Sequence, residues 1–305
     1  MALGGGTVVD RPGVHGMRDV QDTRGVHAVA LGAGRLRVTR RWPDTLRPYL
    51  RSYAGYWDAA ATPFRVRIVP SGRAVVLLSL GEPFAQVHRL AEREHDPGVR
   101  VVGSLIAGLE DGPRIADHPG GQEAIRLELT PLGAYRLFAL PMRELTNTVV
   151  ELTDVLGPRA GELVERLSHT RDWAERFDLL DAALLRRLAE GPEPAAEVAH
   201  AWQLLERSGG NLPVARIAQE TGWSHGYLVR KFTQQVGLTP KTAGRVLRFH
   251  RATGLMARGA VDLSALTAAC GFYDQAHLNR EFRALAAITP GQIAAARMTE
   301  GAVAL

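Results

Sequence analysis

"TGWSHGYLVRKFTQQVGLTP" (Thr221–Pro240) and "CGFYDQAHLNREFRALAAITP" (Cys270–Pro290) are two versions of one sequence within the same chain. The matching pairs are Gly222 with Gly271, Trp223 with Phe272, Leu228 with Leu278, Arg230 with Arg280, Phe232 with Phe282, Thr239 with Thr289, and Pro240 with Pro290. The separation is 49 residues at the glycine pair and 50 from the leucine pair onward, so the second copy carries one additional residue in its turn.

Each copy predicts two short helices joined by a glycine turn. The first helices are "LPVARIAQET", with Pro213 in its first turn, and "DLSALTAAC", with Asp262 as its N-cap. A glycine then supplies a positive φ angle at no steric cost. Ser224 and Asp274 are typical caps of the helix that follows. Helix, glycine turn and helix at this length form a helix-turn-helix unit.

The second helix of each unit has a buried face and a free face. Leu228 and Phe232 are four residues apart, as are Leu278 and Phe282, so each pair belongs to the core. The candidates for contact with base edges are His225, Gly226, Val229, Arg230, Gln275, Ala276, His277, Asn279 and Arg280. Arginine, asparagine and glutamine have the donor and acceptor geometry that reads guanine and adenine in the major groove. The alternative for the arginines is a solvated helix face, and the aromatic candidates could serve in packing or in phosphate contacts instead.

Between the copies, Lys241 to Gly259 reads as one helix. Its length of roughly 25 Å, at about 1.5 Å per residue, could hold two recognition helices near the helical repeat of B-DNA. Arg245, Arg248 and Arg251 recur every three residues along one side. The candidates for contact with phosphates are Lys231, Arg283 and Lys241.

Charge and composition favour a nucleic-acid partner for the last third of the chain. The 305 residues carry a formal charge of +5, but the part from Ser208 onward carries +6 and the remainder −1.

The single cysteine, Cys270, excludes an internal disulfide and predicts a small packing thiol. The sequence has no long apolar segment free of charges, so a cytoplasmic location without membrane contact is expected.

The N-terminal part predicts a β-rich domain followed by helices. Residues 1–41 are expected to be a disordered leader, and 42–190 an antiparallel sheet, sandwich or small barrel with C-terminal helices. "EAIRLELTPLGAYRLF" reads as strand, and "ELTNTVVELTDVLG" as helix. The helix in "RDWAERFDLLDAALLRRLAEG" has apolar residues at spacings of three and four, and either covers the sheet or pairs with a second subunit. Residues 191–209 are a linker and connecting helix, and 210–305 the DNA-binding domain.

The paired units, the linking helix and above all "GFYDQAHLNREFRALAAITP" closely resemble the DNA-binding domain of AraC-type (AraC/XylS) transcriptional regulators over residues 210–295. The resemblance implies an α+β chain, an all-α C-terminal domain whose two recognition helices enter adjacent major grooves, and an N-terminal cupin-like companion domain. Four positions depart from the pattern. Gly226 and Val229 are poor base readers, Thr267 stands where the first copy has Ala218, and Ala287 stands where it has Gly237.

A small barrel could hold one small-molecule effector. The candidate contacts are Tyr53, Tyr56, Trp57, Phe84 and Tyr135, although aromatic residues in strands are usually core. No metal-ligand spacing, phosphate loop or nucleophile elbow is present, so no catalytic residue, metal or cofactor is expected.

The sequence therefore predicts a sequence-specific, effector-responsive transcriptional regulator. Its partners would be a double-stranded DNA operator, an unknown small molecule, RNA polymerase and a second copy through the N-terminal half. Two alternatives stay open. One is a weakly selective architectural DNA binder whose N-terminal domain only oligomerises, and the other is an enzyme fused to a regulator module.

Overall fold

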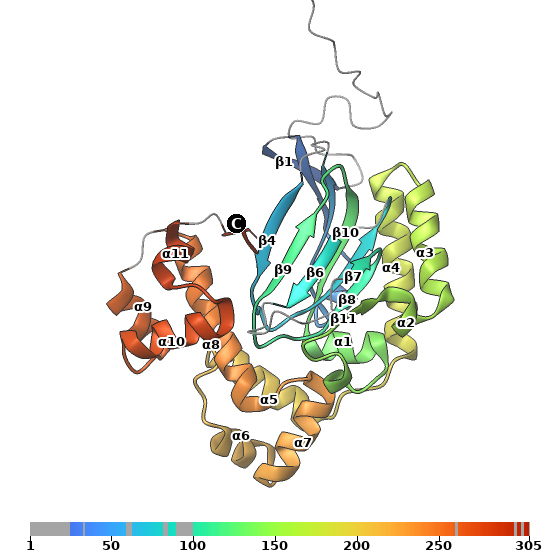
Figure 1. Ribbon diagram of the computed structural model, residues 1–305. Coiled ribbons are helices and arrows are strands. Elements are labelled where there is room, and N and C mark those ends of the chain that lie inside the picture. The colour runs from blue at the N-terminus through green and yellow to red at the C-terminus, as the bar shows by residue number, and fades with distance from the viewer. Residues whose placement is uncertain are drawn as a thin grey trace, which may run out of the picture.

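The computed structural model describes residues 25–32, 34–58, 63–81, 85–89, 100–259, 262–295, 298–299 and 302–304. Two antiparallel sheets and a group of helices make up the N-terminal part, and a bundle of short helices makes up the C-terminal part (Figure 1). The predicted fold class is confirmed in this form.

The larger sheet has seven strands in the order β1-β2-β3-β10-β5-β8-β11. Their bounds are β1 (Val26–Gly32), β2 (Arg35–Arg40), β3 (Leu50–Asp58), β10 (Glu123–Leu129), β5 (Ala74–Ser79), β8 (Leu105–Ala107) and β11 (Val149–Glu151), with η1 (Asp44–Leu46) between β2 and β3. In the described part of the chain β1 and β11 are its two edges, so this sheet is open and is not a closed barrel.

The smaller sheet has six strands in the order β12-β13-β4-β9-β6-β7. Their bounds are β12 (Met298–Thr299), β13 (Ala302–Ala304), β4 (Phe64–Ile68), β9 (Arg114–His118), β6 (Ala85–Arg89) and β7 (Arg100–Val102). β13 pairs with β4, so the end of the chain returns to the N-terminal part, a pairing that the sequence did not predict.

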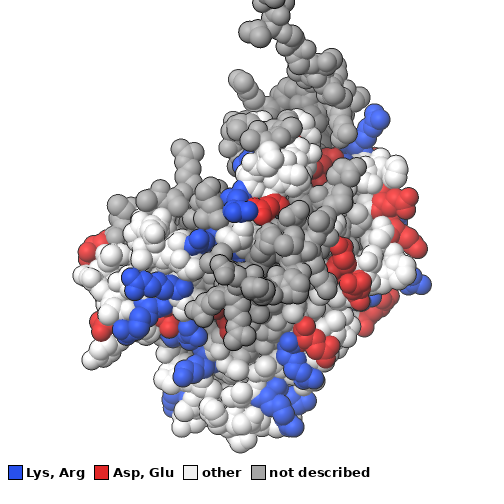
Figure 2. Space-filling view, viewed as in Figure 1, with Lys and Arg blue, Asp and Glu red and all other residues white. Residues whose placement is uncertain are grey.

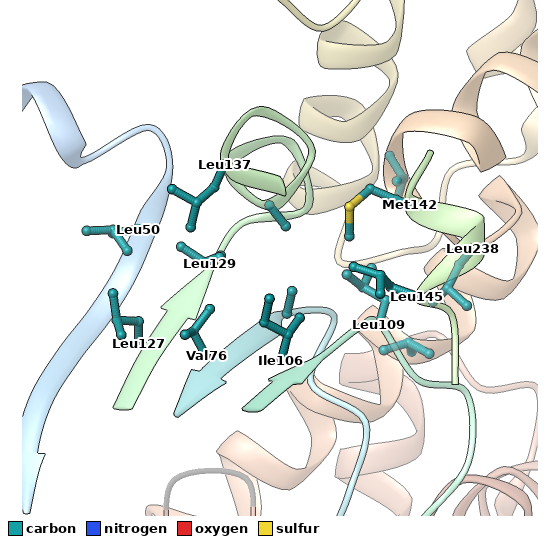
Figure 3. Close-up of a cluster of buried hydrophobic side chains, with 14 of the residues drawn as sticks. Leu50, Val76, Ile106, Leu109, Leu127, Leu129, Leu137, Met142, Leu145 and Leu238 are labelled. Atoms are coloured by element: carbon teal, nitrogen blue, oxygen red, sulfur yellow. The ribbon is translucent and has the colours of Figure 1, made fainter. Parts of the chain in front are cut away.

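The two faces of the larger sheet have different neighbours because side chains alternate along a strand. Leu77 and Ala124 pack with Ala116 of β9 in a small cluster between the sheets. Ile125 and Leu127 face the other way and join the main core beneath the helices. Figure 3 shows part of that core, where side chains of the larger sheet approach α1 (Pro131–Phe138).

Five helical segments follow β10. They are α1, η2 (Met142–Glu144), α2 (Leu152–Leu156), α3 (Pro158–His169) and α4 (Trp173–Glu190). The prediction that α4 covers the sheet is confirmed, since Phe177, Leu180, Leu184 and Leu188 are buried in the main core. Pairing of this helix with a second subunit stays a prediction.

The C-terminal helices are α5 (Ala196–Arg207), α6 (Val214–Thr221), α7 (His225–Val236), α8 (Pro240–Ala257), α9 (Leu263–Cys270), α10 (Gln275–Ala286) and α11 (Pro290–Ala295). Their core is continuous with that of the N-terminal part. Leu238, after α7, lies beside Met142 and Leu145 in Figure 3.

Three expectations for the N-terminal part are wrong. The predicted leader of residues 1–41 contains β1 and β2 in its second half; residues 1–24 lie outside the described residues. "PLGAYRLF" is helix α1 because Thr130 Oγ1 accepts from the Gly133 N–H and Pro131 begins the helix. "ELTNTVVELTDVLG" is split between η2, β11 and α2, since Val149–Glu151 pairs with β8.

Candidate nucleic-acid interface

The first helix-turn-helix unit consists of α6 and α7. Gly222, at φ 70°, ends α6, and its N–H reaches the carbonyls of that helix. Ser224 begins α7, with Oγ accepting from the Tyr227 N–H at 3.4 Å. Leu228 and Phe232 are fully buried, as their spacing predicts.

The second unit, α9 and α10, has the same construction. Gly271, at φ 73°, ends α9, and an added Cβ there would overlap the side chain of Asn211. Asp274 caps α10, with Oδ1 accepting from the His277 N–H at 2.6 Å. Leu278 and Phe282 are fully buried.

Different helices support the two recognition helices. The rings of Phe232 in α7 and Trp202 in α5 have centroids 6.4 Å apart. Phe282 in α10 contacts Phe249 in α8 edge to face, with centroids 4.9 Å apart. Each recognition helix is therefore oriented by an aromatic contact from its buried face.

On the outer face of α7, His225, Gly226 and Arg230 are exposed and Val229 is half-buried. The Arg230 guanidinium lies 5.0 Å from the centre of the Tyr227 ring. A Cβ added at Gly226 would meet open space, and the glycine supplies no side-chain hydrogen-bonding group. This face therefore offers one cation, Arg230, and little else that distinguishes bases.

The outer face of α10 is richer in polar groups. Gln275, Ala276 and Arg280 are exposed, and Asn279 is half-buried. The Gln275 side-chain amide donates to Ser264 Oγ of α9 at 2.8 Å, which holds it at the start of the helix.

His277 has a different environment from its predicted neighbours on α10. It is half-buried, its ring meets Phe272 edge to face, and its Nε2 lies 3.8 Å from Glu281. These contacts favour a packing role over contact with a base.

The cations predicted to contact phosphates remain available. Arg283 and Lys241 are exposed and Lys231 is half-buried. Across the described ranges no hydrogen bond or ion pair engages the side chains of these residues or of Arg280. Figure 2 shows Lys and Arg gathered over the C-terminal helices, whereas Asp and Glu lie mainly over the side formed by α2 to α4.

Two arginines of α8, the linking helix, form hydrogen bonds within the protein. Arg245 Nε donates to Glu281 at 2.9 Å, which joins α8 to α10, and Arg248 Nη1 donates to the Gly210 carbonyl at 2.7 Å. Cys270 is buried, and burial raises the pKa of its thiol, as expected of a packing residue.

Both units are fastened to the N-terminal part at the ends of their recognition helices. Thr146 Oγ1 donates to the Gly237 carbonyl, just after α7, at 2.9 Å. Arg67 of β4 donates through Nη1 to the carbonyls of Ala286 and Ala287, at the end of α10, at 3.1 and 3.3 Å. Arg67 and Thr146 were not candidates in the sequence, because such contacts depend on distant parts of the chain.

The predicted effector contacts are not gathered in one place. Tyr53 is buried beneath α4, where its hydroxyl donates to Asp181 Oδ1 at 3.0 Å, and burial raises its pKa. Tyr56, in the opposite orientation on β3, accepts from Arg37 Nε at 3.4 Å. Trp57 is half-buried, Tyr135 is half-buried on α1, and Phe84 lies outside the described residues.

A cavity of about 410 Å³ lies instead between the helix-covered face of the larger sheet and helices α2, α3 and α4. Its apolar wall includes Leu78, Leu127, Leu156, Leu163, Leu180 and Leu184. Exposed arginines at its edge are Arg159 and Arg166 of α3 and Arg186 of α4.

The described residues contain neither a metal-binding cluster nor a membrane-spanning helix. No group of three or more His, Cys, Asp and Glu side chains there could hold a metal ion. No helix among them is long and apolar enough to cross a membrane.

Comparison with known proteins identifies the C-terminal part. Residues 217–296 match the family described as helix-turn-helix domain. A protein of Bacillus subtilis (strain 168), described as an uncharacterized HTH-type transcriptional regulator, YbfI, is 34% identical over 92 residues, which are 30% of this chain and 33% of that protein. The match therefore spans about a third of that relative's length.

Two of the solved structures that match this chain come from Chromobacterium violaceum and Vibrio cholerae. A transcriptional regulator from Chromobacterium violaceum, described among AraC-type DNA-binding domain-containing proteins, is 29% identical; the match covers 34% of this chain and 95% of that chain, with a TM-score of 0.32. ToxT from Vibrio cholerae is 12% identical, covers 82% of this chain and 100% of its own, and has a TM-score of 0.47.

Proposed function

We propose, from a C-terminal part that carries a helix-turn-helix domain of the AraC type, that this protein is a sequence-specific DNA-binding transcriptional regulator. Its α7 and α10 would enter successive major grooves of one duplex. The arrangement of the two units carries the proposal, since both recognition helices are capped, supported from behind and free on their outer faces.

The proposed roles of the outer residues follow from their chemistry. Arg280 and Asn279 would read base edges, and Gln275 would do so from the first turn of α10. Arg283, Lys231 and Lys241 would contact phosphates and set the register. Arg230, Val229 and Gly226 would contribute mainly charge and shape in the first unit, with His225 at its edge.

We propose further that the regulator responds to a small molecule bound in the cavity beneath α3 and α4. The cavity has an apolar wall, and its lining includes four arginines, Arg159, Arg166, Arg186 and Arg187, against two carboxylates, Glu162 and Glu190. This excess of positive charge suits a compound with an apolar body and an anionic group. Leu163→Trp, which fills the cavity from α3, should abolish a response to such a compound and leave DNA binding intact. A response that survives this substitution would place the effector elsewhere.

Selection of bound fragments from genomic DNA, followed by titration at fixed salt, tests the main proposal. Selected fragments should bind about 10³-fold or more tightly than random DNA of equal length. The double variant Asn279→Ala with Arg280→Ala should lose most of that ratio, whereas Arg171→Ala, an exposed position between α3 and α4, should retain it.

A ratio near one for the wild-type protein would support the architectural alternative, in which affinity comes from phosphates alone. The predicted contact with RNA polymerase and the dimer through the N-terminal half rest on the family resemblance. Sedimentation of the protein with and without DNA would test the dimer.

A further inference from the structure

The one residue that distinguishes the turns of the two units is Tyr273. Trp223 and Ser224 are adjacent in the first unit, whereas Phe272 and Asp274, which occupy the matching places, have Tyr273 between them. Tyr273 is 92% exposed, far more than any other large apolar or aromatic residue recorded as exposed in the described chain.

The backbone of this turn is held in place although the side chain is free. The Tyr273 N–H donates to His277 Nδ1 at 3.2 Å, and the neighbouring Phe272 is buried against the His277 ring. The Asp274 carboxylate turns back to cap α10. A fixed backbone therefore presents a phenol to solvent two residues before Gln275, the first residue of α10.

Tyr227, an aromatic residue of the first unit, has a different environment from Tyr273. Tyr227 lies inside α7, its ring meets Trp223 edge to face at 4.7 Å, and Arg230 covers it. Its position corresponds to His277, so Tyr273 has no counterpart in the first unit. Packing explains Tyr227, but among the described residues no recorded contact engages the Tyr273 ring or hydroxyl.

We infer that Tyr273 contacts the DNA backbone, its hydroxyl donating a hydrogen bond to a phosphate at the edge of the groove that α10 enters; this rests on the proposed function. The first turn of a recognition helix lies nearest the base edges. A residue just before that turn lies beside the groove wall, where the sugar-phosphate chain runs. Tyrosine hydroxyls are common donors to phosphate oxygens.

The contact would give the second unit an anchor that the first unit lacks. A phosphate contact fixes register and carries no sequence information by itself. Tyr273 would therefore strengthen binding equally on all operator variants.

The test compares Tyr273→Phe and Tyr273→Ala in the full-length protein on a fragment selected by the wild type. Both should weaken binding by about 5- to 10-fold through loss of one charge-assisted hydrogen bond. The loss should be the same on every single-base variant of the fragment. Thermal unfolding should be unchanged because the side chain is exposed, and Arg171→Ala, at an exposed position between α3 and α4, should bind as the wild type does.

Unchanged affinity for Tyr273→Ala would overturn the inference. So would a loss confined to Tyr273→Ala and to one base pair, since that pattern would indicate contact of the ring with a base. Failure of the wild type to select any fragment would instead overturn the proposed function, so the two failures are distinguishable.

Discussion

The recognition helix of the first helix-turn-helix unit packs against α1 and η2 of the N-terminal part, whereas that of the second unit is joined to the N-terminal part through Arg67. The end of α7 and the turn after it, Gln235 to Leu238, are buried, and α7 contacts α1, η2 and α5. α10 rests on α8 and meets the N-terminal part through Arg67. The first unit thus holds the C-terminal domain against the N-terminal part. The second unit has more base-reading groups on its outer face.

The largest expected effects come from emptying the two cores. Phe232→Ala and Phe282→Ala should each cost about 3–5 kcal/mol of stability in urea unfolding, because both rings are fully buried. Amide hydrogen exchange should distinguish the two variants. Phe282→Ala should raise exchange in α9 and α10, whereas Phe232→Ala should also raise it in α1 and η2. The same exchange pattern for both variants would contradict the asymmetry.

The next effect concerns base reading. Arg280→Ala should weaken binding to a selected fragment by about 1–3 kcal/mol and relax preference at one base pair. Arg230→Ala should weaken binding more evenly across sequences, because its neighbours Gly226 and Val229 offer no base-reading groups. Titration at fixed salt against single-base variants measures both. A sharper loss of preference for Arg230→Ala would reverse the assignment.

The fastening of the second unit should have a smaller effect. Arg67→Ala removes the hydrogen bonds to the last carbonyls of α10 and should cost about 1 kcal/mol of stability. It should also let the protein tolerate changes in spacing between the two halves of its DNA site, measured on fragments with one base pair inserted or deleted. Thr233→Ala, within α7, is a control that should leave spacing tolerance unchanged.

The smallest effects compare Gly237 with Ala287, which follow α7 and α10. Ala287 has φ 54°, and the relief of the left-handed strain, about 1–2 kcal/mol, should exceed the entropic cost of a glycine, so Ala287→Gly should stabilise the protein by roughly 1 kcal/mol or less. Gly237 has φ 99°, and an added Cβ would lie 2.9 Å from Thr146 Oγ1, so Gly237→Ala should destabilise it. Opposite signs in thermal unfolding are expected. Equal signs would show that backbone conformation does not govern these positions.

The sequence predicted the parts of the structure that depend on neighbours along the chain. The glycine turns, the caps Ser224 and Asp274, and the buried pairs Leu228–Phe232 and Leu278–Phe282 are all confirmed. Thr130 and Pro131, a cap and a first-turn proline, mark the start of helix α1 in the sequence. The strand prediction was wrong there because it continued past these two residues into the helix.

Contacts between distant segments could not be predicted in the same way. Nothing local marks Arg67 as the partner of the α10 carbonyls, or Ala302–Ala304 as the partner of β4. Tyr53 resembles a ligand contact in sequence and becomes a core residue because Asp181 and Phe177 of α4 meet it. The additional residue in the second turn was evident from the offset, but the exposure of Tyr273 required the structure.

The most direct test of the central claim is selection of binding sites from random DNA, with the wild type, Arg230→Ala, and the double variant Asn279→Ala with Arg280→Ala in parallel. The wild-type site should have two segments about one helical turn apart, with the stronger base preference in the segment that the double variant loses. Equal preference in both segments, or a stronger preference in the segment that Arg230→Ala loses, would contradict the claim that the second unit is the principal reader.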